Sequence, residues 1–103
     1  MTGERWQKLS FFEQMANVGS EVERAIGWRE KNNPEYSCLA AERMLELMDL
    51  TIDDVKNKKR LRELLRLREV LADFFYASNS FCSSDALWRS YFLPFNWAAR
   101  LNC

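Results

Sequence analysis

The segment "RLRELLRLREVLADFF", residues 60–75, carries the strongest fold signal in the chain, because its leucines recur at helical spacing. At about 100° per residue, one face of this helix is apolar, and Arg68 falls in the middle of that face. The polar flank carries Arg62, Arg66, Glu69 and Asp73. The apolar face consists of Leu61, Leu64, Leu65, Leu71, Ala72 and Phe75. We therefore predict an amphipathic helix that buries its leucines.

Three further segments have apolar residues at helical spacing. Asn33 and Pro34 predict a helix start, because asparagine is favoured at the N-cap and proline at the first helical position. Ser83 or Ser84 is expected to cap the last helix. The predicted helices cover residues 5–31, 34–50, 58–76 and 85 onward.

Four helices joined by short links predict one all-α domain over residues 1–103, an antiparallel (up-down) four-helix bundle. Pro94 lies within the last helix and is expected to kink it, because proline removes a backbone hydrogen bond. Gly19 marks either a close helix crossing or a local kink. The link 51–57 is either a helical extension capped by Thr51 or a loop.

Composition excludes several kinds of chemistry. The chain has no histidine, which removes Ser-His-Asp and Cys-His nucleophiles, HExxH metal sites and imidazole acid–base steps. Cys38, Cys82 and Cys103 form no CxxC pair, so we predict free thiols. No apolar run is long enough to span a membrane, and the N-terminus lacks a signal-peptide core. We expect a soluble, cytoplasmic protein with no membrane partner.

The formal net charge is zero, but the charges are divided unequally along the chain. Residues 1–55 carry eleven acidic and six basic side chains, whereas residues 56–103 carry four acidic and nine basic ones. The two halves should attract each other, within one chain or between two. Neutrality disfavours nucleic-acid binding, and Glu69 and Asp73 interrupt the arginine face, so a nucleic-acid-associated bundle is only a second alternative.

Arg43 and Arg68 fall among apolar positions, where a charge must be paired and hydrogen-bonded. We predict a buried ion-pair network that fixes the register of the helices. A phosphate or nucleotide ligand is the alternative, because a guanidinium group binds phosphate bidentately. The predicted network or ligand site comprises Glu21, Arg24, Arg43, Glu46, Arg68, Glu69 and Asp73.

Paired carboxylates on two neighbouring predicted helices suggest an alternative, enzymatic function. Glu42 with Glu46, and Glu69 with Asp73, could hold Mg²⁺ and hydrolyse a nucleotide. The pattern resembles the all-α nucleotide pyrophosphohydrolases of the MazG and dimeric dUTPase type, which carry an ExxE pair followed by ExxD. The spacing here is ExxxE and ExxxD, and one residue rotates a ligand by about 100°. No cofactor is expected, with Mg²⁺ as the alternative.

The last predicted helix is dense in aromatic residues, which are favoured at protein interfaces. We predict that Trp88, Phe92, Phe95 and Trp97 form an interface with a second copy or with another protein. Together with the unequal charge distribution, this predicts a non-enzymatic helical-bundle module for interaction or regulation, acting as a homodimer or other oligomer.

Three strings carry a resemblance that spans nearly the whole chain: "WQKLSFFEQMANVGSEVERAIGWR" (6–29), "AAERMLELMDLTI" (40–52) and "RLRELLRLREVLADFF" (60–75). In this order they resemble a family of small prokaryotic all-α helical-bundle proteins that has no known catalytic assignment. More distantly, the chain resembles the HEPN group, whose active ribonucleases carry an arginine followed by a histidine. Without a histidine, that resemblance implies a non-catalytic member.

Overall fold

Helices make up most of the described chain. The computed structural model describes residues 3–101, which contain no β-strand. The elements are α1 (Gly3–Gln7), α2 (Phe11–Glu30), α3 (Pro34–Asp53), the 3-10 helix η1 (Val55–Arg60), α4 (Leu61–Tyr76) and α5 (Asp85–Leu101). The all-α prediction is confirmed. Within the described range, none of the helices has the length and apolar character needed to cross a membrane.

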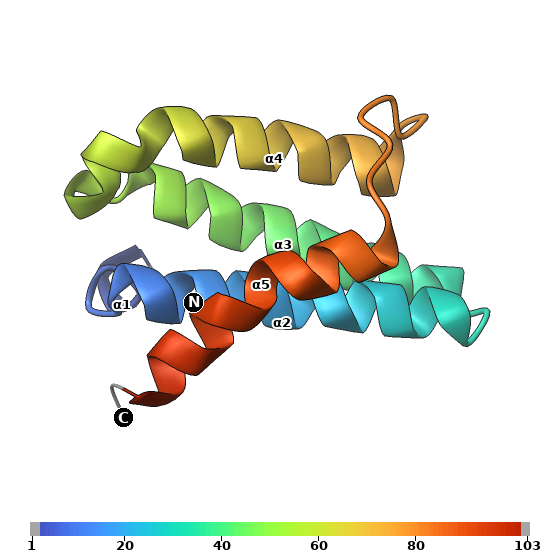
Figure 1. The fold of residues 1–103 in the computed structure, drawn as a ribbon, viewed down its shortest axis with the longest axis horizontal. Coiled ribbons are helices and arrows are strands. Elements are labelled where there is room, and N and C mark those ends of the chain that lie inside the picture. The colour runs from blue at the N-terminus through green and yellow to red at the C-terminus, as the bar shows by residue number, and fades with distance from the viewer. Residues whose placement is uncertain (1–2, 102–103) are drawn as a thin grey trace.

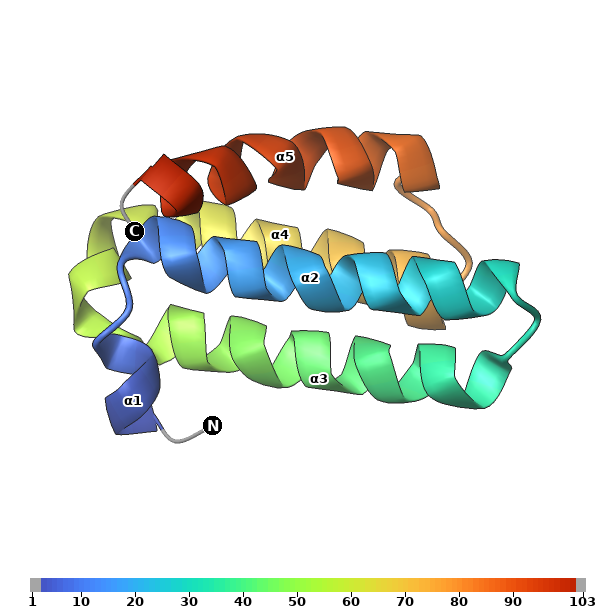
Figure 2. The same ribbon diagram turned by 90° about the horizontal axis from the view of Figure 1, so that it is seen from below.

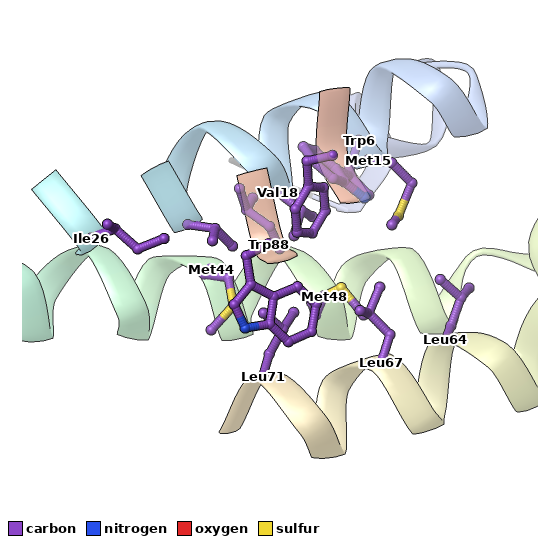
Figure 3. Close-up of a cluster of buried hydrophobic side chains, with 13 residues drawn as sticks. Trp6, Met15, Val18, Ile26, Met44, Met48, Leu64, Leu67, Leu71 and Trp88 are labelled. Carbon is purple, nitrogen blue, oxygen red and sulfur yellow. The ribbon is translucent and has the colours of Figure 1, made fainter. Parts of the chain in front are cut away.

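The four long helices pack around one core, as Figures 1 and 2 show. α2 packs against both α3 and α5, whereas α4 packs against α3. In Figure 1, α5 is inclined to α2, and α4 and α5 diverge from the loop that joins them. Figure 3 shows the core, where Trp88 of α5 lies among Met44, Met48 and Leu71.

The predicted single helix over residues 5–31 is wrong, because the chain turns between α1 and α2. Ser10 caps α2: its Oγ accepts a hydrogen bond from the backbone N of Glu13 at 3.1 Å. In return, Glu13 Oε1 accepts from the backbone N of Ser10 at 3.2 Å. Such a capping box satisfies two otherwise unpaired donors and starts a new helix. The S-x-x-E pattern of residues 10–13 is its sequence signal.

The link after α3 also differs from both predicted forms. α3 continues to Asp53, so Thr51 lies inside a helix and caps none. Asp54 instead caps η1, accepting from the backbone N of Lys56 at 3.1 Å. The predicted caps at Asn33 and Ser84 are confirmed, since Asn33 accepts from Tyr36 N and Ser84 from Leu87 N, each at 3.1 Å.

Buried polar side chains tie α1, α2, α3 and η1 together at one end of the molecule. Gln14 Nε2 donates to Asp54 Oδ2 at 2.8 Å and to the carbonyl of Trp6 at 3.0 Å. Asn57 Nδ2 donates to Gln14 Oε1 at 2.9 Å, and Trp6 Nε1 donates to Thr51 Oγ1 at 3.0 Å. These groups satisfy one another, so their burial does not leave unpaired donors.

α5 crosses α2 at Gly19. A Cβ atom at this position would lie 2.9 Å from Cβ, Cγ and Cδ1 of Phe92, so only glycine permits the approach. The predicted close crossing is confirmed. Pro94 lies within α5, which continues through it as one helix. The kink at Pro94 stays a prediction.

Candidate functional site

Part of the predicted ion-pair network gathers around Glu21. Its Oε1 lies 3.0 Å from Arg24 Nη1 and 3.9 Å from Arg43 Nε. The Glu21 side chain is only 9% exposed, whereas those of Arg24 and Arg43 are 66% and 62% exposed. The expectation that Arg43 points into the core is wrong, because a long arginine side chain can keep its charged end in water. Two exposed cations therefore cover one buried carboxylate.

These charges belong to an open groove of about 450 Å³ between α2 and α3, which we call the α2–α3 groove. The rings of Trp28 and Tyr36 meet edge to face there, with centroids 4.9 Å apart. Carboxylates outnumber guanidinium groups, which opposes a phosphate ligand. The lining residues are Glu21, Arg24, Trp28, Tyr36, Leu39, Ala40, Glu42, Arg43 and Glu46.

The other members of the predicted network lie elsewhere. Arg68 Nε donates to Asp49 Oδ1 at 2.6 Å, which joins α4 to α3. Asp73 faces the loop after α4 and accepts from the backbone N of Ser80 at 3.0 Å and of Phe81 at 3.1 Å. The seven predicted residues therefore do not form one network, because α4 presents Arg68 to α3 and Asp73 to the loop.

The two carboxylate pairs are not brought together as a metal centre. Among residues 3–101, no three His, Cys, Asp or Glu side chains are grouped so that they could hold a metal ion. Glu42 and Glu46 line the α2–α3 groove, whereas Asp73 holds the loop and Glu69 is exposed on α4. Mg²⁺ needs oxygen ligands in near-octahedral geometry. The Mg²⁺ alternative stays a prediction that this geometry does not support.

The predicted aromatic interface is corrected in part. Trp88 and Phe92 are each 3% exposed, so they belong to the core of this chain and expose almost no surface to a partner. The close crossing at Gly19 is the physical reason, since it brings Phe92 against α2. Phe95 is half-buried, with its ring centroid 6.0 Å from that of Phe11. Trp97 is exposed.

A second groove, the α4–α5 groove, lies where α4 and α5 diverge and has a volume of about 440 Å³. Leu87 and Tyr91, one helical turn apart on α5, are 50% and 42% exposed. The lining residues are Glu63, Arg66, Leu67, Val70, Leu87, Trp88 and Tyr91. Apolar side chains predominate, as they do in binding grooves for helices.

Glu63 and Arg66 are the charged residues of this groove. Burial raises the pKa of Tyr91, and the negative charge of Glu63 raises it further. Within the described residues, Glu63 has no hydrogen bond or ion pair. Arg66 lies over the ring of Phe81, with its Cζ 4.9 Å from the ring centroid, and makes no ion pair there. Neither charged group is part of an ion pair among the described residues.

The wall of the α4–α5 groove also contains an unsatisfied donor. Trp88 Nε1 is buried and has no hydrogen-bond partner in the described part of the chain. An unpaired buried donor typically costs about 1–3 kcal/mol. The core beside this groove therefore contains an unpaired hydrogen-bond donor, whereas the buried polar groups around Gln14 are paired with one another.

Sequence reasoning did not single out Leu87 and Tyr91 as binding residues. Both lie on the same broad apolar arc as Trp88 and Phe92. An arc of this width cannot be buried entirely against one neighbouring helix. The width of this apolar arc was the sequence signal for an exposed apolar surface. Periodicity alone does not say which residues of the arc stay exposed.

Comparison of this sequence with family models, curated proteins and solved structures finds no match. The resemblances stated from the sequence stay predictions, and the case for a function rests on the grooves themselves.

Proposed function

We propose that this chain is a non-enzymatic helical-bundle interaction module that self-associates through the α4–α5 groove. The exposure of Leu87 and Tyr91 at an apolar groove is the main support for this proposal. Burying apolar surface contributes about 25 cal/mol per Å². Removing these two side chains from water would therefore contribute favourably to the free energy of binding. A helix laid into such a groove would cover them.

The proposed architecture is an up-down four-helix bundle, open between α4 and α5 and bent at Pro94. The alternating direction of α2, α3, α4 and α5 in Figure 2 supports it, as does the inclination of α5 in Figure 1. A bundle that is open on one side leaves part of its core exposed, which favours an added helix.

A cytoplasmic location is part of the same proposal. Cys38 and Cys82 are free thiols, as in proteins of reducing compartments, and Cys103 lies outside the described residues. No nucleic-acid partner is included, since Glu63 and Glu69 interrupt the arginines of α4.

Leu87→Glu tests the proposed function. A glutamate in the first turn of α5 is compatible with the helix dipole, but it puts a charge in the apolar groove. Light scattering on a sizing column at micromolar concentration should give an oligomeric mass for the native chain and a monomeric mass for this variant. Leu39→Glu changes a leucine on α3 that is 60% exposed, against 50% for Leu87; it is the control and should stay oligomeric.

A native chain of monomeric mass would overturn the proposal. Dissociation by Leu39→Glu with Leu87→Glu still oligomeric would also overturn it, by moving the interface to the α2–α3 groove. Circular dichroism must show unchanged helix content in both variants.

A further inference from the structure

We infer that the occupant of the α4–α5 groove is a second copy of this chain, placed by a two-fold axis that sets Glu63 of each copy against Arg66 of the partner subunit. The inference rests on the proposed function and specifies its geometry.

The charges that line the α4–α5 groove suit a two-fold interface. In a two-fold interface the same patch meets itself, so any charges in it must be self-complementary. Glu63 and Arg66 have opposite signs, lie three residues apart on α4, and form no ion pair with each other or with other described residues. Antiparallel apposition of two α4 helices brings each Glu63 to an Arg66, which makes two pairs. A foreign helix would have to supply a cation for Glu63 and an anion for Arg66, whereas a second copy already carries both.

The apolar side chains of the α4–α5 groove also suit a two-fold interface. Each copy exposes Leu87 and Tyr91 at a groove that Leu67 and Val70 also line. A two-fold axis sets the exposed side chains of each copy against the groove of the other. Contact with the ring of Phe81 positions the guanidinium group of Arg66, and a guanidinium in such a contact can still donate its N–H groups to a carboxylate.

The size of the molecule is compatible with such an interface. A standard interface buries about 800 Å² per partner, which is about 12% of the 6839 Å² accessible surface of this chain. The principal extents of 36 × 27 × 25 Å are compatible with one face of this size.

Charge reversal tests the arrangement by sedimentation equilibrium. Glu63→Arg alone should weaken association about tenfold, because each pair becomes Arg against Arg. Arg66→Glu alone should do the same, with Glu against Glu. An equimolar mixture of the two single variants should associate as strongly as the native chain, since every contact in the mixed dimer is again Glu against Arg. The doubly reversed variant should also recover.

The mixture is the decisive sample. A pair within one α4 helix would be restored in the double variant but not in the mixture, so a mixture that stays monomeric overturns the inferred arrangement. Single variants that associate like the native chain overturn it as well. In both cases the loss of association in Leu87→Glu would still stand, which keeps failure of the arrangement separate from failure of the proposed function.

Discussion

Gly19 shows how a single residue controls the packing of two helices. Its missing Cβ lets Phe92 of α5 lie directly on the backbone of α2. Gly27 lies in the same helix, but a Cβ there would have no neighbour within 4 Å. The two glycines therefore have the same conformational cost in α2 but different tertiary roles.

Alanine at these two positions should have opposite effects. Gly19→Ala forces Phe92 away and should destabilise the fold by about 1–3 kcal/mol, as overpacking does. Gly27→Ala adds helix propensity without a clash and should stabilise it by about 0.5–1 kcal/mol. Urea unfolding of both variants measures this. Equal stabilisation by both would contradict the close crossing.

Asp54 is a buried carboxylate that remains charged. Burial pushes its pKa upward, but hydrogen bonds from Lys56 and Gln14 outweigh that effect, so the pKa lies below its ordinary value of 3.8. The folded state therefore favours the carboxylate over the acid. Its contribution to stability is present above the unfolded pKa and is lost as pH falls through the folded pKa.

Asp54→Asn should remove this pH dependence. At neutral pH we expect a loss of about 1–3 kcal/mol, since a charge-assisted bond from Lys56 disappears inside the polar cluster. As the pH falls through the folded pKa of Asp54, which lies below 3.8, the carboxylate becomes protonated and the native chain and the variant should converge. Thermal unfolding from pH 7 to pH 2.5 provides the measurement. A constant difference between them would contradict the assigned role.

At the scale of elements, the loop between α4 and α5 is organised by Asp73. Its carboxylate accepts two backbone hydrogen bonds, from Ser80 and Phe81. Asn79 adds a bond from its Nδ2 to the carbonyl of Ser83 at 2.8 Å. The loop thereby places the ring of Phe81 against the guanidinium group of Arg66. It also leads directly into the first turn of α5. Asp73 acts on the groove through the loop.

Asp73→Ala separates this structural role from metal binding. It leaves two backbone donors unpaired and should cost about 1–3 kcal/mol. Glu69→Ala, one turn earlier and exposed, should change stability by less than about 0.5 kcal/mol. Unfolding curves with and without Mg²⁺ test both. If Mg²⁺ stabilises the native chain and neither variant, the carboxylates are metal ligands and the loop role is secondary.

At the scale of the whole molecule, some charged side chains of the acidic and basic halves pair with each other within the chain. Arg89 of α5 pairs with Glu23 at 2.9 Å and Glu30 at 2.8 Å on α2, and Arg68 pairs with Asp49. These pairs hold the basic helices on the acidic ones. They leave Glu63 and Arg66 unpaired at the groove, where the proposed second copy docks.

Periodicity and local side chains were sufficient for the all-α class, for the caps at Asn33 and Ser84, and for the break between α4 and α5. Each of these depends on residues within a few positions of one another, so it is readable along the chain. The turn before α2 was readable too, from the pattern at Ser10 and Glu13.

The partners of Arg68 and Asp73, the burial of Trp88 and Phe92, and the exposure of Leu87 depended on the three-dimensional packing. They follow from the rotation of each helix about its axis and from the point where α5 meets Gly19. Contacts between distant residues set both quantities. An apolar arc wider than one neighbour can cover is visible in the sequence, but only that crossing decides which of its residues face water.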